Sequence, residues 1–431
     1  METLRIAMVS DWFPPRVGGV ETSISELSKA LGRLGHEVMV VTHENSSYRG
    51  PPGLVKGDGY LVYWIGTRLL AKDDVTYDPL VIAKASLFVK RNAVDVVHAH
   101  GVTSVLGLMT SMIASGGTGV PSVLTNHSLL SGSLKGLGRL SLKYALKWPT
   151  LLVGVSRAAA EDVSRISGRP ADVIHNCIDV DSWREMATWS HLDGDPAIVI
   201  TSRLSPRKNP LEIAKVASLV ARKLPRARFY VVGDGMLMRD LVESLRGFGV
   251  EDRVKVLGLM PRERVAQLLS GADAFVLTSY RESFGIAVLE AMALGVPPLV
   301  YSSPGVLDLV EDGRSGIIAD GPEAMADAIV RVASDEGLRR DLARGAEDRA
   351  RLFDCSIIAR RYVEEYRRAE EVKCSDDRRF LAYRLYRALT GDPVKEGEWC
   401  RGRKWEYHER SADGIVPVVR RGAGRPAVHE H

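Results

Sequence analysis

Two glutamates eight residues apart, Glu282 and Glu290, are the residues of this sequence best placed to do chemistry. An apolar run, AFVLTS, precedes them and is predicted to be a strand, and the segment after Gly285 is predicted to be a helix. Glu282 then lies in a strand-to-helix turn, with Glu290 about two turns into the helix. The backbone amides of Ser283, Phe284 and Gly285 begin that helix without intrahelical partners, which makes the turn a natural anion site.

A carboxylate on each side of an anion site suits a sugar nucleotide. The free amides would face a diphosphate, and the two carboxylates would accept hydrogen bonds from sugar and ribose hydroxyls. The alternative is a solvated helix start with a favourable acidic residue near its N-terminus. The segment alone is compatible with both interpretations.

A pair of cations follows the predicted strand AIVITSR. Arg203 and Lys208 lie at its C-terminal end, where ligands bind in parallel-sheet folds. They could neutralise a diphosphate leaving group in place of a metal ion. Arg207, between them, is the one we expect to be solvated, and a wholly solvated basic loop is the alternative.

Glycines follow two further predicted strands and precede helices. Gly18 and Gly19 come after RIAMVS, and Gly233 and Gly235 come after FYVV. Such turns allow the backbone to approach a phosphate or a sugar closely. The spacing is not GxGxxG, so a dinucleotide site is not indicated, and a plain tight turn is the alternative.

Two histidines, His100 and His127, stand at the ends of the predicted strands VDVVHAH and PSVLTNH. Either could contact a donor sugar or an acceptor, and a structural hydrogen-bonding role is the alternative for each. The DxD strings at 179–181 and 193–195 lie away from these strand ends. We therefore expect no metal site there.

These residues must be positioned by a repeating strand–helix pattern that restarts near residue 195. Apolar runs alternate with amphipathic segments such as ETSISELSKALGRLG, which is typical of doubly wound parallel sheets of the α/β class. We expect Rossmann-like domains at 1–185 and 195–355, a helix at 356–372 and a partly disordered extension at 373–431.

The segment SGSLKGLGRLSLKYALKWP is predicted to be a basic amphipathic helix. Its cations recur at every fourth position: Lys135, Arg139, Lys143 and Lys147. Four apolar residues fall on the opposite face: Leu137, Leu140, Tyr144 and Trp148. Leu142 and Leu146 lie within the basic stripe, where exposed leucines would fit contact with a membrane surface. The alternative is a basic face that is exposed to solvent and contacts no membrane.

The composition excludes several classes of protein. The chain has 431 residues, 45% hydrophobic and 26% charged, as expected for a soluble protein of two or three domains. Its net charge of +4 argues against a nucleic-acid binder. No apolar run reaches the ~18 residues needed to span a membrane, and no signal peptide is evident. The cysteines Cys177, Cys355, Cys374 and Cys400 form no CxxC pair, so neither a zinc site nor a disulfide framework is predicted, and a reducing cytoplasm is expected.

Taken together and in this order, the motifs resemble glycosyltransferase family 4, whose members are retaining enzymes of the GT-B fold. RESFGIAVLEAMALGVP is similar to the family's E-x7-E motif, and GGVE, VSR, HNCIDVDSW, SRLSPRKNP and VVGDG match its other landmarks. The resemblance implies two Rossmann-like domains facing across a cleft, with a C-terminal helix crossing back to the first domain. Within the family, the N-terminal segments are most similar to members that transfer N-acetylglucosamine to phosphatidylinositol.

The resemblance also implies roles at the matched positions. Glu290 would bind the ribose hydroxyls, Glu282 the 3- and 4-hydroxyl region of the donor sugar, and His127 its 6-hydroxyl. Arg203 and Lys208 would stabilise the departing diphosphate. The glycine turn at 18–19 would approach the phosphates or the acceptor.

The implied reaction moves a sugar, N-acetylglucosamine, from a UDP-linked donor to a lipid-borne acceptor with retention and without a required cofactor or metal. No enzymatic nucleophile is evident, which favours front-face attack. The expected partners are a nucleotide sugar, a lipid or glycan acceptor and the cytoplasmic face of a membrane. The alternatives are a soluble family member acting on a small sugar or glycan, a catalytically silent binding protein, and an epimerase. The sequence departs from the family's pattern at Cys177, usually glycine, and at Asp308, often glutamate.

Overall fold

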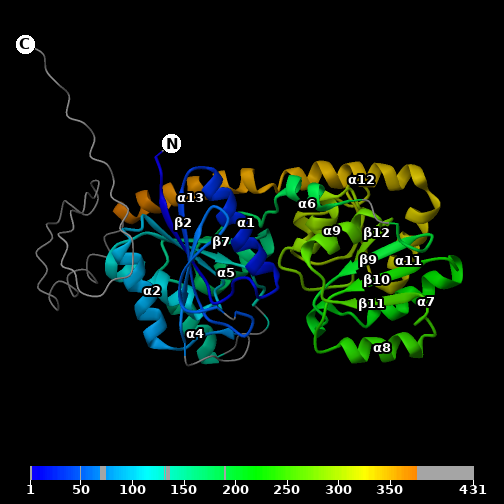
Figure 1. Cartoon of the computed structure of the whole chain (residues 1–431), viewed down its shortest axis with the longest axis horizontal. Coiled ribbons are helices and arrows are strands. Elements are labelled where there is room, and N and C mark those ends of the chain that lie inside the picture. Colours follow the sequence, from blue (N-terminus) through cyan, green and yellow to red (C-terminus); the bar gives the residue numbers. More distant parts are fainter. Residues whose placement is uncertain are drawn as a thin grey trace, which may run out of the picture. The chain divides into compact units, whose positions relative to one another are not determined.

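The computed structural model describes residues 2–48, 50–67, 74–130, 132, 136–188 and 191–375. They form two sheets, each covered by helices on both faces, as the strand–helix pattern predicted (Figure 1). No described helix is both long enough and apolar enough to cross a membrane. The predicted extension lies outside these residues from position 376 onward.

The first sheet is built from the N-terminal half of the chain. Its strands are β1 (Arg5–Val9), β2 (Glu37–His43), β3 (Gly53–Lys56), β4 (Leu61–Ile65), β5 (Val96–His100), β6 (Ser122–Asn126), β7 (Leu151–Gly154) and β8 (Asp172–Val173). Their order is β3-β4-β2-β1-β5-β6-β7-β8, and only β3 and β4 pair antiparallel. Parallel strands therefore end at one edge, which brings His100 close to the residue that follows β6, His127.

The second sheet is parallel throughout. Its strands are β9 (Ala197–Thr201), β10 (Arg228–Val232), β11 (Val254–Gly258), β12 (Ala274–Leu277), β13 (Pro298–Tyr301) and β14 (Ile317–Ala319). Their order, β11-β10-β9-β12-β13-β14, puts β9 beside β12. The loops after these two neighbouring strands carry the predicted cations and Glu282.

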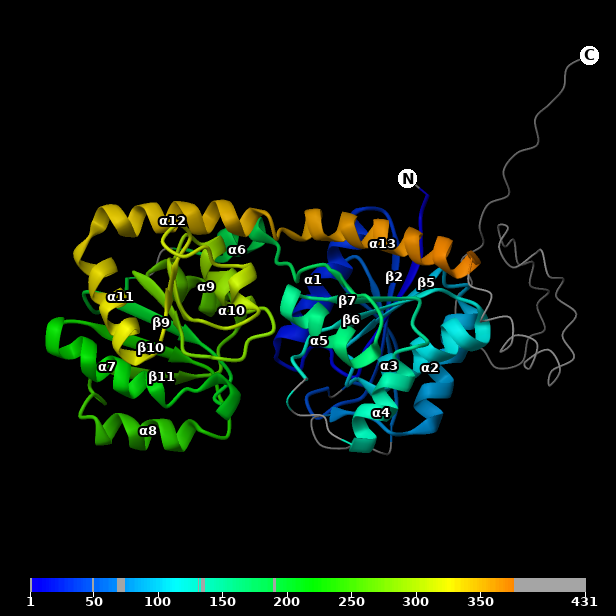
Figure 2. The ribbon, with the colours of Figure 1, turned by 180° about the vertical axis from the view of Figure 1, so that it is seen from behind.

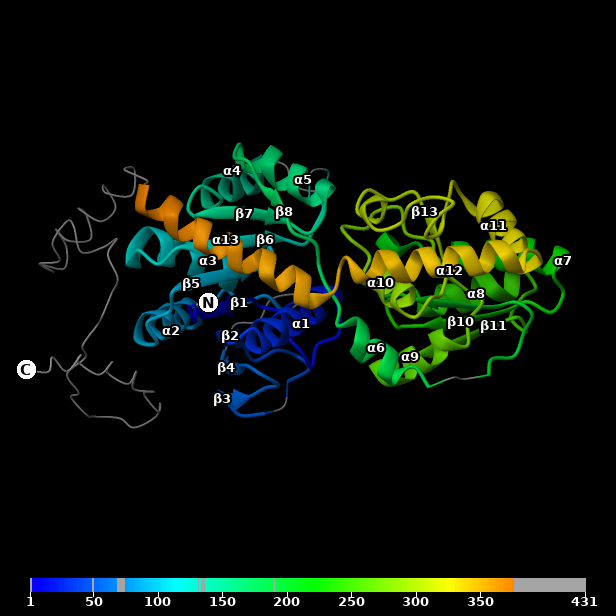
Figure 3. The ribbon, with the colours of Figure 1, turned by 90° about the horizontal axis from the view of Figure 1, so that it is seen from above.

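Helices from both ends of the chain cover one face of the first sheet. α1 (Gly19–Arg33) and α13 (Cys355–Ser375) share a core with β1 and β2 (Figure 3). The predicted return of the C-terminal helix is thus confirmed. The opposite face is covered by α2 (Pro79–Arg91) and α3 (Val105–Ile113), while α4 (Gly136–Ala145) and α5 (Arg157–Ser167) pack near β6 and β7 (Figure 2).

The second sheet is covered in the same way. One face carries α6 (Val180–Met186), α9 (Arg262–Ser270), α10 (Ile286–Ala293) and α12 (Glu336–Arg351). The other carries α7 (Glu212–Lys223), α8 (Met238–Gly247) and α11 (Pro322–Ser334). Because strands buried on both faces need apolar side chains on both, the continuous apolar runs of this sequence were readable as strands.

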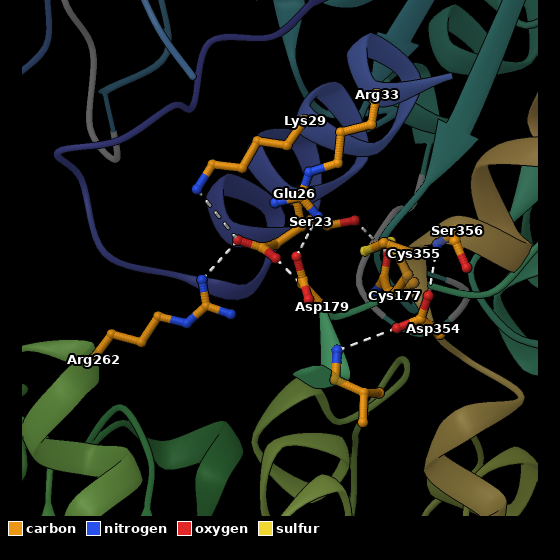
Figure 4. The surroundings of a disulfide bond; sticks show 12 residues. Ser23, Glu26, Lys29, Arg33, Cys177, Asp179, Arg262, Asp354, Cys355 and Ser356 are labelled. Atoms are coloured by element: carbon orange, nitrogen blue, oxygen red, sulfur yellow. Dashed lines mark hydrogen bonds and ion pairs between the residues drawn. A yellow bond between two sulfur atoms is a disulfide. The ribbon is translucent and has the colours of Figure 1, made fainter. Parts of the chain in front are cut away.

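The expectation of no disulfide is wrong. Cys177 and Cys355 are joined by a disulfide, with their Cα atoms 4.8 Å apart (Figure 4). Cys177 precedes α6 and Cys355 begins α13, so the bond links the two places where the chain passes between the sheets. A separation of 178 residues hides such a pair from any short cysteine motif.

The orientation predicted for the basic helix is also wrong. On α4 and just after it, the leucines expected to be exposed are buried, with Leu142 8% and Leu146 0% exposed. Three of the four residues placed on the opposite face are exposed instead, Leu137 83%, Leu140 64% and Tyr144 59%, whereas Trp148 is half-buried. Periodicity fixed which residues share a face of the helix, but not which face meets the core.

Candidate functional site

Glu282 and Lys208 form an ion pair at the carboxyl edge of the second sheet. Glu282 follows β12 and Lys208 ends a short 3-10 helix, Pro206–Lys208, in the loop after β9. The Lys208 Nζ donates to Oε1 of Glu282, whose side chain is 5% exposed. The side chains of Thr278 and Ser279 donate to the carbonyl oxygens of Asn209 and Arg207, at 3.1 Å each, and so hold the two loops together.

The turn after Glu282 is shaped to leave amides free. The amide of Glu282 donates to Ser303 Oγ at 2.5 Å, and its carbonyl accepts from the amide of Gly305 at 3.0 Å. Gly285 has a φ of +102°, a conformation that favours glycine, and α10 begins at the next residue. Within the described chain, no hydrogen bond uses the amides of residues 283–285, as the anion-site interpretation requires.

Arg203 lies against the first glycine turn. Its Nη2 donates to the carbonyl of Val17 at 3.1 Å, and a Cβ on Gly18 would meet that nitrogen at 3.2 Å. A Cβ on Gly19 would meet the Cδ1 of Ile286, the first residue of α10, at 3.5 Å. The structure therefore brings Arg203, the glycine turn and the start of α10 together, and leaves Arg207 exposed as expected.

The second glycine turn, with Gly233 and Gly235, packs against the loop after β9 that carries Arg203 and Lys208. A Cβ on Gly233 would lie 1.9 Å from the carbonyl oxygen of Ser202, and one on Gly235 would lie 2.3 Å from that of Leu204. Both glycines also have positive φ, +138° and +158°. Their observed contacts are thus with the backbone that carries Arg203, so in this structure they act by packing.

α10 begins at Ile286, directly after Gly285 as predicted, which puts Glu290 about one turn into the helix and not the two turns expected. Burial raises the pKa of Glu290 to about 7, with a further increase from Glu26 and an opposing decrease from Arg262. Arg262 donates to Glu26 at 2.6 Å and lies over the ring of Trp183. A carboxyl with this pKa changes charge near neutral pH.

Arg262 is a residue that our sequence reasoning missed. Its Nε and Nη2 atoms are buried, and neither has a hydrogen-bond partner among the described residues. It begins α9, far in sequence from both Glu26 and Glu290, and no motif surrounds it. Only the fold places this guanidinium where it can lower the pKa of Glu290.

Asp308 was noted in the sequence only as a departure from a family pattern. The structure gives it two partners from the first half of the chain: Arg157, whose backbone amide and Nε donate at 2.7 and 2.6 Å, and His175 at 3.4 Å. Burial raises the pKa of Asp308, but these hydrogen bonds outweigh that effect and lower it to about 2. The His175 ring also lies 5.8 Å from Phe284, so this carboxylate supports the turn that holds the free amides.

His127 and His100 meet at the carboxyl edge of the first sheet. Nδ1 of His100 lies 3.1 Å from Nε2 of His127, and the two side chains are almost fully buried. His100 has no exposed surface, so the expected direct contact with a donor sugar or an acceptor is not open to it. Lys135, the first cation of the predicted stripe, lies outside the described residues.

Metal ligands do not gather anywhere in the described ranges. Of the two DxD strings, Asp179 caps α6 and pairs with Arg33 at 2.5 Å, and Asp193 pairs with Lys255 at 3.0 Å. These carboxylates are engaged by cations and by the helix start.

Comparison with known proteins gives two family matches. Residues 17–182 match the model described as Glycosyltransferase Family 4, and residues 181–349 match that of Glycosyl transferases group 1. A phosphatidylinositol N-acetylglucosaminyltransferase subunit from Arabidopsis thaliana is 31% identical, over 90% of this chain and 86% of its own. An uncharacterised glycosyltransferase of Methanocaldococcus jannaschii is 27% identical, over 86% of this chain and 99% of its own.

Solved structures give the same fold. Sucrose-phosphate synthase from Thermosynechococcus elongatus superposes with a TM-score of 0.70 at 20% identity, over 84% of this chain and 98% of its own. HepE from Anabaena, in complex with UDP-glucose, superposes with a TM-score of 0.65 at 20% identity, over 84% of this chain and 99% of its own. The GT-B fold expected from the sequence is thus confirmed.

Proposed function

Because the chain belongs to glycosyltransferase family 4, we propose that this glycosyltransferase moves N-acetylglucosamine from a UDP-linked donor to a phosphatidylinositol-like lipid, with retention of configuration. The observation that carries the proposal is the Lys208–Glu282 ion pair beside the free amides of residues 283–285. The cation and the amides would bind the diphosphate of a sugar nucleotide, and the carboxylate would bind its sugar. The name of the Arabidopsis relative supports the choice of sugar and acceptor.

The donor would be held by groups that the structure brings to the second sheet. Glu290 would accept from the ribose hydroxyls, and Glu282 from the 3- and 4-hydroxyl region of the sugar. The diphosphate would face the amides of residues 283–285 and the cations Arg203 and Lys208. Lys208 now neutralises Glu282, so donor binding would give this ammonium group a second negative partner.

Transfer then needs charge stabilisation more than a protein nucleophile. As the glycosidic bond breaks, negative charge grows on the diphosphate, where the cations and amides are already oriented. The acceptor hydroxyl would attack from the face that the diphosphate leaves and would pass its proton to a diphosphate oxygen. We propose no step through a metal, because the described residues supply cations for the same charge.

Nucleotide binding can be tested by thermal unfolding in EDTA. We expect UDP and UDP-N-acetylglucosamine to raise the melting temperature, since a ligand that binds only the native state stabilises it, by about 2.7 kcal/mol at a hundred times Kd. The increase should be lost in Glu290→Ala. A rise with GDP ligands alone would move the proposal to a mannosyltransferase, and no rise with any nucleotide would remove it.

The pKa of Glu290 gives a pH dependence with a definite sign. If the ionised carboxylate accepts from the ribose hydroxyls, UDP affinity should fall as pH drops through about 7, by about tenfold between pH ~8 and pH ~6. Titration calorimetry of the wild type and of Glu290→Gln measures this. The ligand's own titration is common to both proteins, so the extra dependence should vanish in the variant. Equal slopes would contradict this role.

The acceptor side of the proposal rests on α4. Leu137, Leu140 and Tyr144 form one exposed apolar stripe, and the exposed cations Arg139, Lys143 and Lys147 lie beside it. A helix with an exposed apolar stripe and basic flanks fits the interface of an anionic membrane. We therefore place the protein on the cytoplasmic face of a membrane, with a lipid acceptor delivered there. The disulfide is compatible with this placement, because some intracellular proteins, notably those of hyperthermophiles, hold such bonds.

Vesicle flotation tests the membrane contact. We expect the protein to float with vesicles containing phosphatidylinositol, and the triple change Leu137→Ser, Leu140→Ser, Tyr144→Ser to reduce the bound fraction at least about fivefold, since each apolar side chain contributes buried area. A matched control removes a tyrosine and two leucines that are exposed in or just before α2 instead: Tyr77→Ser, Leu80→Ser and Leu87→Ser. No flotation of the wild type would favour the soluble alternative, in which a small sugar or glycan accepts.

A further inference from the structure

Three histidines lie along one buried polar path in the first sheet. His98 and His100 stand on the same face of β5, with ring centroids 4.0 Å apart, and His127 follows β6. At the far end of the path, Nδ1 of His98 lies 2.7 Å from the hydroxyl of Tyr366 on α13. The family resemblance assigns a sugar contact to His127 alone, so the other two rings need a separate explanation.

The protons of His100 can be assigned from its partners. Nε2 of His100 lies 3.4 Å from Sδ of Met8, and a thioether can only accept, so this nitrogen carries a proton. Burial lowers the pKa of His100 well below its usual range, which keeps the ring neutral. Nδ1 of His100 is therefore unprotonated and can only accept.

The assignment passes on to His127. Because Nδ1 of His100 accepts, its partner Nε2 of His127, 3.1 Å away, must donate. Burial lowers the pKa of His127 to about 3, so this ring is neutral as well and has a single proton. Nδ1 of His127 is then a bare acceptor, and no hydrogen bond occupies it within the described part of the chain.

We propose that His100, oriented by Met8, is a positioning residue that fixes His127 in the Nε2-protonated tautomer, so that His127 accepts a hydrogen bond from a donor-sugar hydroxyl. The substrate class follows: the donor sugar carries a free hydroxyl at the position that His127 contacts, not a group that can only accept. The family resemblance implies that this is the 6-hydroxyl. This inference rests on the proposed function for the identity of the ligand, but the tautomer itself does not.

The tautomer can be measured without substrate. Long-range proton–nitrogen NMR of the full chain, labelled at histidine nitrogens, distinguishes a protonated from a bare ring nitrogen, and His127→Gln identifies the signals of His127. We expect Nε2 of His127 to be protonated and Nδ1 bare at neutral pH. An Nδ1-protonated ring or an imidazolium would overturn the proposal.

Four variants separate positioning from general damage. His100→Asn keeps an acceptor oxygen near the place of Nδ1 and should preserve the tautomer. His100→Leu removes the acceptor, and Met8→Leu removes the sulfur that orients His100, so both should give a mixture. Tyr366→Phe removes a hydroxyl from the same path without touching the His100–His127 bond, and should change nothing at His127. A tautomer that survives His100→Leu would also overturn the proposal.

Donor analogues test the direction of the hydrogen bond to the sugar. Fluorine in place of the 6-hydroxyl can accept but not donate, and hydrogen can do neither. In the wild type we expect both analogues to lower kcat/KM by a similar factor, about tenfold. In His100→Leu the same two analogues should lower kcat/KM by a smaller factor. A fluoro analogue clearly better than the deoxy analogue would mean that His127 donates, against the proposal. If the tautomer is as expected but no nucleotide sugar is turned over, the proposed function fails and the fixed tautomer stands.

Discussion

Replacing Glu282 by alanine is expected to lower kcat/KM for sugar transfer at least about a hundredfold. The carboxylate is buried and paired with Lys208, in the same turn as the free amides of residues 283–285. Its removal would take away the acceptor for the sugar hydroxyls and would leave the ammonium group of Lys208 without its partner. Both losses disturb the charges that surround the sugar and the diphosphate, where charge develops in the transition state. Radiolabelled transfer to a phosphatidylinositol acceptor, with UDP-N-acetylglucosamine as donor, gives the rate.

The control is Glu282→Gln, which keeps the shape and one acceptor oxygen but removes the charge. We expect it to fall between the wild type and the alanine variant if hydroxyl contacts and the pairing with Lys208 both contribute. Thermal unfolding of all three proteins separates loss of activity from loss of fold. Turnover of Glu282→Ala near that of the wild type would contradict the role given to this residue.

The fold could be predicted because its strands are apolar on both faces. Every strand expected from an apolar run is present, including β1, β5, β9 and β12. The strands that were not predicted lie at or beside sheet edges, such as β3 with its exposed Val55, and β8 with only two residues. An edge strand pairs on one side only and buries fewer apolar side chains. Its sequence therefore resembles that of a loop.

The site was predicted in its residues and not in its contacts. Spacing along the chain could not show that Lys208 meets Glu282, 74 residues away, because the meeting depends on β9 lying beside β12. The same holds for Arg262 near Glu290 and for His100 beneath His127. Each of these pairings follows from strand order, which a single sequence does not state. The roles given to these residues remain predictions until they are measured.

Breaking the disulfide is expected to destabilise the protein by about 4 kcal/mol without changing its fold. The bond closes a loop of 178 residues, and a cross-link of this length removes so much freedom from the unfolded chain that entropy alone would contribute about 5 kcal/mol. In the native state the two crossings remain joined without it: the amide of Cys355 donates to the carbonyl of Ile178 at 3.0 Å, and that of Val180 donates to Asp354 at 3.2 Å. The effect should therefore come mainly through the unfolded state.

Urea unfolding of Cys177→Ser/Cys355→Ser, monitored by tryptophan fluorescence, measures the loss in the free energy of unfolding. Nucleotide binding at room temperature should be unchanged. A reductant should destabilise the wild type to the level of the double variant and leave the variant unaffected, because only the wild type has this bond to lose. Mass spectrometry of unreduced peptides should recover residues 177 and 355 in one linked species. Equal stability of the two proteins under oxidising conditions would mean that the disulfide does not restrain the unfolded chain, and the stability of the crossings would then rest on backbone pairing alone.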